Sequence, residues 1–153
     1  LSLDEKVYIS ENASGMGGSQ IFLENGHSYP LSELVKSLVV CSANDSCVAV
    51  AEKISGSEDV FVARMNEKAA ELGMDNTLFA NCTGLPKDTQ YSCAADVAVM
   101  FANLIKHAEY FDYSRIWLED FAHEVCIRRA RRRFERTQIQ KRVGDVRLRL
   151  RKL

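Results

Sequence analysis

Apolar residues recur at α-helical spacing through the middle of the chain, and helix-capping residues divide this pattern into short segments. The first segment follows Pro30, whose fixed φ angle and missing N–H suit the start of a helix. Its apolar residues lie three and four positions apart: Leu31, Leu34, Val35, Leu38 and Val39. This spacing places them on one face of a helix that ends near Cys41. We therefore expect a small, mostly helical unit.

Two further helices are expected directly after the first. One covers residues 45–55 and ends at Gly56, a residue that readily adopts the left-handed conformation of a helix C-terminus. The next begins at Ser57, whose hydroxyl can cap it, and ends at Gly73. Its buried face is expected to contain Phe61, Met65, Ala69 and Leu72.

A long connection, residues 74–91, separates these helices from a fourth. Connections of this length without regular structure are usually functional or tightly packed. Asn81 and Thr83 can tie the loop to itself, and Gly84 permits a positive φ angle. Ser92 is expected to start the fourth helix, whose apolar face contains Val97, Met100, Phe101, Leu104 and Ile105.

Residues 1–29 are expected to form short strands and turns. Residues 6–9 alternate weakly and predict one strand, and residues 20–23 predict a second. Residues 14–19 form a glycine-rich turn, which lacks the Lys-Ser/Thr of a phosphate-binding loop. Residues 24–27 contain an Asn-Gly pair typical of a hairpin turn.

The composition, 46% apolar and 27% charged residues, is that of a globular protein. No apolar run reaches the roughly 18 residues of a membrane-spanning helix, and no signal peptide is recognisable at Leu1.

Charge is divided unevenly: residues 1–122 carry 8 basic against 18 acidic side chains, and residues 123–153 carry 12 against 3. The chain also lacks an initiator Met, so we interpret it as part of a longer protein.

The cysteines are odd in number and show no C-x-x-C pair or histidine at zinc-ligand spacing. They are Cys41, Cys47, Cys82, Cys93 and Cys126. We therefore expect no metal site and no other cofactor, and we interpret the cysteines as small buried apolar residues.

A polar turn, Ser42-Ala43-Asn44, joins the first two helices. Its simplest interpretation is structural, with Asn44 or Asp45 as the N-cap of the second helix. A loop that only reverses the chain would more often contain Gly or Pro, however, and this turn instead presents two hydrogen-bonding side chains.

Several blocks follow one another around this turn, at residues 11–19, 31–45, 61–66, 72–74 and 77–85, followed by Tyr91-Ser92 with Asp96. In this order they resemble the serine-type D-alanyl-D-alanine carboxypeptidases, which are low-molecular-weight penicillin-binding proteins of peptidase family S11. The resemblance covers roughly residues 4–121. A β-lactamase would share the active-site logic, but residues 42–44 and 74–91 fit the carboxypeptidases better.

Members of this family carry the motifs S-x-x-K, S-x-N and K-T-G. Ser42 and Asn44 match S-x-N. The resemblance implies that Ser42 relays a proton near the Lys base and the leaving group, as a hydroxyl that donates and accepts can do. It implies that Asn44 binds the substrate amide and helps to hold the Lys. A Ser nucleophile needs such a base within hydrogen-bonding distance.

The S-x-x-K and K-T-G motifs are absent from the 153 residues. In the family the S-x-x-K helix shortly precedes the segment that corresponds to Leu1, so the chain looks cut just after its nucleophile. We therefore predict that this chain alone cannot form an acyl-enzyme with penicillin.

The resemblance implies an α+β, β-lactamase-like transpeptidase fold, of which residues 1–122 would supply mainly the helical lobe and a small β-hairpin. It also implies a peptidoglycan stem peptide ending in D-Ala-D-Ala as substrate and β-lactam antibiotics as inhibitors of the intact enzyme. The intact family member would act outside the cytoplasm, at the cell wall or membrane. A fragment with uncovered apolar faces should be marginally stable or self-associate.

Residues 123–153 are rich in arginine and depart from the family pattern. They can be interpreted as a basic arm for nucleic acid or anionic lipid, as a solvated helix, or as out-of-frame translation or a disordered tail; we favour translation in another frame. The basic arm would make the chain a non-enzymatic binding protein, which is the alternative function. We expect no nucleic-acid partner.

Overall fold

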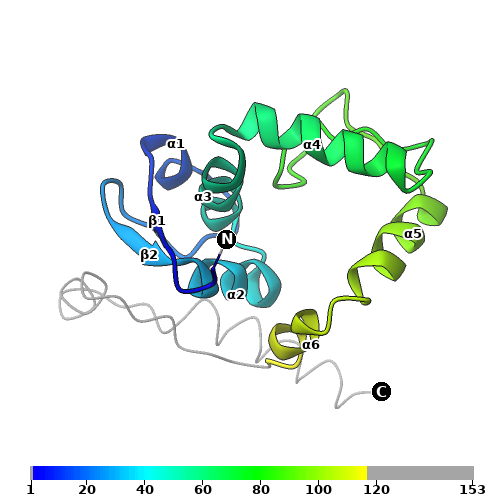
Figure 1. Cartoon of the computed structure of the whole chain (residues 1–153). Coiled ribbons are helices and arrows are strands. Elements are labelled where there is room, and N and C mark those ends of the chain that lie inside the picture. Colours follow the sequence, from blue (N-terminus) through cyan, green and yellow to red (C-terminus); the bar gives the residue numbers. More distant parts are fainter. Residues whose placement is uncertain (1, 117–153) are drawn as a thin grey trace, which may run out of the picture. The chain divides into compact units, whose positions relative to one another are not determined.

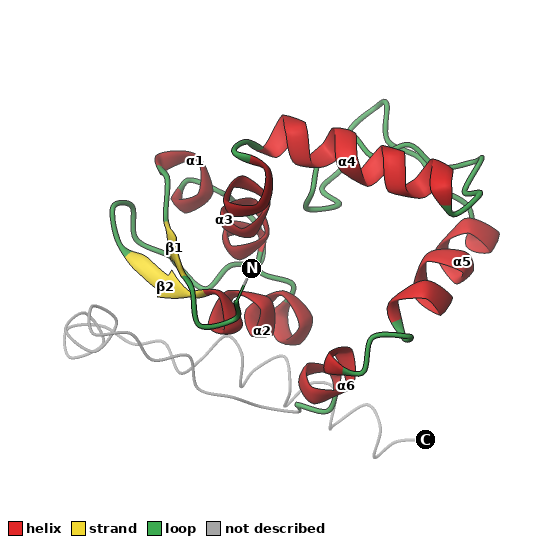
Figure 2. Ribbon diagram, in the orientation of Figure 1, coloured by secondary structure: helices red, strands yellow, loops and turns green. Residues whose placement is uncertain are grey.

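The computed structural model describes residues 2–116, which form two short strands and six helices (Figures 1 and 2). Residues 123–153, and with them the predicted tail, lie outside the described residues. Within residues 2–116, no helix is both long and apolar enough to cross a membrane. The elements are β1 (Lys6–Tyr8), α1 (Glu11–Ser14), β2 (Ser28–Pro30), α2 (Leu31–Cys41), α3 (Asn44–Ser55), α4 (Glu58–Glu71), α5 (Ala94–Leu104) and α6 (Glu109–Ser114).

The strands β1 and β2 pair in an antiparallel sheet, in which Val7 lies opposite Tyr29. Both of these side chains are buried, whereas their neighbours along each strand are exposed. This alternation is that of a sheet with one face on a core. β1 contacts α3 and β2 contacts α2, so the buried face of the sheet belongs to the helical core.

The second strand was expected at residues 20–23, and this prediction is wrong. The strand that pairs with β1 is Ser28–Pro30, directly after the predicted Asn-Gly turn, where Gly26 has a φ angle of +80°. In residues 20–23 the backbone N–H groups of Ile21 and Leu23 donate to the carboxylate of Asp45, and a side chain thus takes the place of a neighbouring strand. The short helix α1 was also not foreseen in the region that was expected to contain only strands and turns.

The helices α2 and α3 pack against each other at the centre of the core. Leu34 of α2 and Val48 of α3 are fully buried. The two helices are also joined by a buried hydrogen bond, 2.7 Å long, between the hydroxyls of Ser37 and Ser46. The Ser37 hydroxyl donates to the carbonyl of Leu34 as well, which satisfies these polar groups inside the core.

The boundaries of α2, α3 and α4 agree with the sequence prediction within one or two residues. Ser57 caps α4 by accepting a hydrogen bond from the N–H of Val60, and Gly56 and Gly73 adopt positive φ angles after α3 and α4. The helix α5 begins two residues later than expected, after Cys93.

Burial on α4 and α5 is lower than the sequence predicted. Of the four apolar residues expected on the inner face of α4, only Ala69 is buried. The residues expected on the apolar face of α5 are all exposed, for example Val97 at 44% and Phe101 at 49%. Hydrophobic spacing fixes which face of a helix is apolar, but not whether another element covers that face.

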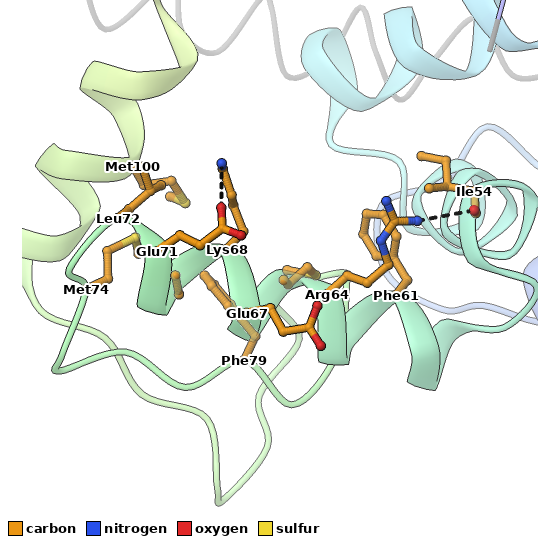
Figure 3. Close-up of a pocket in the computed structure, with 12 residues that line it drawn as sticks. Ile54, Phe61, Arg64, Glu67, Lys68, Glu71, Leu72, Met74, Phe79 and Met100 are labelled. Atoms are coloured by element: carbon orange, nitrogen blue, oxygen red, sulfur yellow. Dashed lines mark hydrogen bonds and ion pairs between the residues drawn. The ribbon is translucent and has the colours of Figure 1, made fainter.

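A pocket of about 490 Å³ lies along α4 (Figure 3). Phe61, Met65 and Leu72 line it, together with Phe79 and Met100 from other segments. Charged residues of α4 lie at its rim, where Lys68 pairs with Glu71 at 2.9 Å. This pocket contains neither Ser42 nor Asn44 in its lining, so it is separate from the turn singled out by the sequence.

Candidate active site

Ser42 ends α2 in the left-handed region, with φ 55° and ψ 47°. For a residue other than glycine this conformation costs about 1–2 kcal/mol. The backbone N–H of Ser42 donates to the carbonyl of Leu38, which closes the last turn of the helix. The side chain is exposed, and its hydroxyl has no hydrogen-bond partner among the described residues. Strained backbone of this kind is concentrated at functional sites, and here it presents a free hydroxyl.

Asn44, two residues later, is held firmly. It is 6% exposed, and its backbone N–H donates to the carbonyl of Ser19 at 2.7 Å. Its side-chain Nδ2 donates to the carbonyl of Gly17 at 2.8 Å. The amide group therefore has a fixed orientation beside the glycine-rich segment 14–19, with its Oδ1 uncommitted among the described residues.

Gly18 is the glycine of this segment that the fold requires. A Cβ atom at residue 18 would lie 2.7 Å from Asn44 Nδ2, which is closer than real Cβ contacts. Its φ angle is also +80°, a value that glycine adopts without strain. The glycine therefore lets the backbone approach the Asn44 side chain.

Asp45 was proposed, with Asn44, as an N-cap of the second helix, and this prediction is wrong. The capping residue is Ala43, which makes no side-chain capping bond, and both Asn44 and Asp45 lie inside α3. Asp45 has no exposed surface, and its carboxylate accepts from the N–H groups of Ile21, Leu23 and Ser46 at 2.9–3.3 Å. It anchors a distant segment and also satisfies one N–H group in the first turn of its own helix.

The loop 74–91 is internally tied as expected. The Asn81 side chain accepts from the N–H of Gly84 at 2.7 Å and donates to the carbonyl of Leu85 at 2.7 Å, and Gly84 has a φ angle of +77°. Leu85 approaches the glycine-rich segment, because a Cβ at Gly18 would lie 3.8 Å from Leu85 Cδ2. The loop and the segment 14–19 thus lie on the same side of the turn at Ser42 and Asn44.

Two side chains to which the sequence assigned no role, Asn66 and Asp96, bind residues 76–79 near the start of this loop. Asn66 on α4 pairs with the backbone of Phe79, accepting at 2.8 Å and donating at 2.9 Å. Asp96 on α5 accepts from the Thr77 hydroxyl and from the N–H of Asn76, each at 2.8 Å. The Thr77 hydroxyl and the Asn76 N–H lower the pKa of Asp96, with a smaller contribution from Cys93, against the opposing effect of desolvation. Asn66 and Asp96 have no local sequence signal, since their partners are 13 and 19–20 residues away.

The four cysteines in the described residues are half-buried free thiols, whereas small buried apolar residues were expected. The thiol of Cys41 donates to the carbonyl of Ser37 within α2, and burial raises its pKa. Cys126 lies outside the described residues.

The structure thus brings Ser42 and Asn44 together on one turn, with an exposed hydroxyl beside a clamped amide. The sequence contains no S-x-x-K and no K-T-G motif, so the groups that would face them are not supplied by these 153 residues. The arrangement can offer a proton relay and an amide for substrate binding, but no activated nucleophile.

Solved structures with a similar fold define the class. The chain is similar to the D-alanyl-D-alanine carboxypeptidase DacD of Francisella tularensis, with a TM-score of 0.74 and 32% identity over 90% of this chain and 35% of that one. It is also similar to penicillin binding protein 5 of Haemophilus influenzae, with a TM-score of 0.72 and 32% identity over 80% of this chain and 36% of that one. The fold is therefore that of the penicillin-binding-protein-like transpeptidases, here represented by a helix-rich part with a small antiparallel sheet.

The family follows from the sequence comparison. The model of the D-alanyl-D-alanine carboxypeptidase family, peptidase S11, matches residues 1–135, and the chain belongs to this family. It is 45% identical over 124 residues to the D-alanyl-D-alanine carboxypeptidase DacF of Bacillus subtilis, which covers 81% of this chain and 32% of that protein. It is 37% identical over 106 residues to DacA of Escherichia coli, covering 69% of this chain and 26% of that protein. The chain thus spans about a third or less of the length of these relatives.

Proposed function

We propose that this chain is the part of a serine-type D-Ala-D-Ala carboxypeptidase that supplies the S-x-N wall of the active site. The whole enzyme would remove the terminal D-Ala from a peptidoglycan stem peptide through an acyl-enzyme. The observation that carries the proposal is the turn itself: an exposed Ser42 hydroxyl on strained backbone beside a buried and doubly anchored Asn44. Membership of the family supports the assignment.

Ser42 and Asn44 have different chemical roles in this proposal. The Ser42 hydroxyl accepts a proton and passes it towards the leaving D-Ala nitrogen, which a group that both donates and accepts can do. Asn44 offers its amide to the peptide group of the substrate and orients the catalytic Lys. Neither residue attacks the carbonyl carbon, because the Ser nucleophile and its Lys base belong to the S-x-x-K motif, which the 153 residues lack.

This assignment also implies where the whole enzyme acts and what inhibits it. Peptidoglycan lies outside the cytoplasmic membrane, so the enzyme would work there, at the cell wall or membrane surface. β-Lactams would acylate the same nucleophile. The alternative of a basic-tailed binding protein depends on residues 123–153, which are outside the described residues, and no described feature favours it.

A chimera tests the proposal directly. Residues 4–116 would replace the corresponding segment of the Bacillus subtilis carboxypeptidase DacF, the rest of which is expected to supply the family motifs S-x-x-K and K-T-G. The chimera is expected to bind fluorescent penicillin covalently and to release D-Ala from a D-Ala-D-Ala peptide. Ser42→Ala and Asn44→Ala are each expected to lower kcat at least about tenfold, as for the loss of a positioned proton-transfer or hydrogen-bonding group.

Two controls complete this experiment. The 153-residue chain alone should acquire no fluorescent label, and a covalent adduct on Ser42 would show that the proposed division of roles is wrong. Ser32→Ala, at a half-buried position in the first turn of α2, should leave the kcat of the chimera unchanged. A folded chimera whose turnover is equally insensitive to Ser42→Ala and Ser32→Ala would overturn the assignment of Ser42.

A further inference from the structure

Two half-buried thiols from different parts of the chain lie against each other. Cys47 is in the first turns of α3, and Cys82 is in the loop 74–91. The Cys47 sulfur donates to the backbone carbonyl of Cys82 at 2.9 Å, across 35 residues of sequence. The other two cysteines of the described residues bond close to their own positions, Cys41 to Ser37 and Cys93 to Asp96. Cys47 and Cys82 therefore form a pair.

The surroundings of this pair distinguish the two sulfurs. The neighbouring Cys82 side chain lowers the pKa of Cys47, while desolvation and the Glu58 carboxylate oppose this effect. The Cys47 side chain, together with burial, raises the pKa of Cys82. Glu58 faces the pair from α4 and accepts from the Cys82 N–H at 3.2 Å. Cys47 is thus the thiol that ionises first, and the N-terminal end of α3 also favours its thiolate.

We propose that Cys47 and Cys82 are a thiol–disulfide modification site, which closes into an intramolecular disulfide on exposure to a small-molecule disulfide such as oxidised glutathione. The proposal rests on the contact between the two residues and does not depend on the proposed enzymatic function.

The reaction proceeds by two thiol exchanges. The Cys47 thiolate attacks one sulfur of oxidised glutathione, forms a mixed disulfide and releases one glutathione thiolate. Cys82 then loses its proton to solvent and attacks the Cys47 sulfur, which breaks the mixed disulfide and releases the second glutathione thiolate. The protein loses two electrons and two protons, and one oxidised glutathione becomes two reduced molecules.

The bond would tie the loop to the turn that carries Ser42 and Asn44. Cys47 lies three residues after Asn44, and Cys82 lies three residues before Leu85, which approaches Gly18 beside the Asn44 side chain. A cross-link over 35 residues restricts the unfolded chain strongly, because the stabilisation increases with the length of the closed loop. Oxidation is therefore expected to hold this wall of the site in place.

Oxidation of the 153-residue chain tests the proposal. The protein would be equilibrated with mixtures of reduced and oxidised glutathione, its remaining thiols alkylated, and the non-reduced peptides analysed by mass spectrometry. The expected product is a single chain with an intramolecular cross-link between Cys47 and Cys82 and no disulfide to a second chain. Its melting temperature should be higher by about 5 °C or more than that of the reduced protein.

Serine variants separate this pair from the other thiols. Cys47→Ser and Cys82→Ser should each abolish the cross-link and the rise in melting temperature, whereas Cys41→Ser, Cys93→Ser and Cys126→Ser should keep both. Four outcomes with the unmodified chain would overturn the proposal: glutathione retained on Cys47 without a cross-link, a link to a different cysteine, disulfides between molecules, or no oxidation at all. These outcomes are measured on the unmodified chain, so the proposal can be refuted even if a serine variant misfolds.

Discussion

The carboxylate of Asp45 accepts backbone hydrogen bonds that a neighbouring strand would otherwise accept. It is fully buried and accepts the N–H groups of Ile21 and Leu23, which would otherwise have no neighbouring backbone to bond. A buried N–H without a partner costs about 1–3 kcal/mol. The arrangement of the candidate site therefore depends on single buried residues such as Asp45, whose side chain is not exposed at the site surface.

Replacing Asp45 should therefore destabilise the chain strongly. Asp45→Ala is expected to lower the free energy of unfolding by about 3 kcal/mol or more, since several buried N–H groups lose their acceptor. Asp45→Asn keeps one oxygen and should cost less. Urea denaturation monitored by circular dichroism measures both.

Asp59→Ala is the matched control, because Asp59 is an exposed acidic residue in the first turn of α4. Its effect should be limited to about 0.5 kcal/mol from the helix dipole. Equal destabilisation by Asp45→Ala and Asp59→Ala would contradict the anchoring role.

Asp96 should make stability depend on pH in the acid range. The Thr77 hydroxyl and the Asn76 N–H lower its pKa in the folded state. A lowered pKa contributes stability that is present above the ordinary aspartate value, about 3.9, and is lost as the pH falls through the folded value. The free energy of unfolding of the unmodified chain should thus fall more steeply below about pH 4 than that of Asp96→Asn.

Chemical denaturation at a series of pH values measures the slopes, and Thr77→Val should reduce the slope in the same direction. Equal slopes for the unmodified chain and Asp96→Asn would refute this.

At the scale of elements, the first turn of α3 and the glycine-rich segment 14–19 form one unit. Gly18 is the point of closest approach, and Gly17 next to it provides a control, since a Cβ at Gly17 would meet no atom within 4 Å. Gly18→Ala combines a clash with Asn44 and an unfavourable φ angle, and should lower the free energy of unfolding by about 1–3 kcal/mol. Gly17→Ala should change it by about 0.5 kcal/mol or less. Thermal melts of both variants distinguish the two positions, and similar losses would show that the contact with Asn44 is unimportant.

Sequence prediction succeeded where the stabilising interactions join residues close in sequence, and failed where they join distant residues. The boundaries of α2, α3 and α4 were predictable because Pro30, Gly56, Ser57 and Gly73 act on their own neighbours. The strand at residues 20–23 was predicted wrongly because its acceptor, Asp45, is more than twenty residues away.

The candidate site was predictable only in part. Ser42 and Asn44 could be selected from the order of similar blocks along the chain, whereas helix spacing alone favoured a cap. The left-handed backbone of Ser42 and the bonds of Asn44 to Gly17 and Ser19 have no local signal, because they depend on how the segment 14–19 folds back.

At the scale of the whole molecule, the apolar face of α5 is only partly covered by the described residues, where Phe101 packs edge-on against Tyr110 and Met100 lines the pocket along α4. Val97, Met100, Phe101, Leu104 and Ile105 are each about 40–50% exposed, although their spacing is that of a buried helix face. A contiguous apolar surface of this kind is a common cause of association.

The isolated chain is therefore expected to self-associate, with an apparent mass in analytical ultracentrifugation that rises with concentration. Phe101→Glu should shift the distribution towards monomer, because it places a charge on this face without emptying a core position. Val60→Glu, at an exposed position on α4, should not. A chain that stays monomeric at high concentration would contradict the expected role of α5.

The adjacent residues Asn44 and Asp45 together limit how far the length of residues 17–23 can change. Asn44 binds the carbonyls of Gly17 and Ser19, and Asp45 binds the N–H groups of Ile21 and Leu23. The first turn of α3 thus binds every second residue of this segment: the carbonyls of residues 17 and 19, and then the N–H groups of residues 21 and 23. A single inserted or deleted residue between 17 and 23 would change the spacing of these four partners, so that they could not all bond to Asn44 and Asp45 at once. Amino-acid substitutions on the outside of this segment are compatible with the fold, whereas its number of residues is fixed by α3.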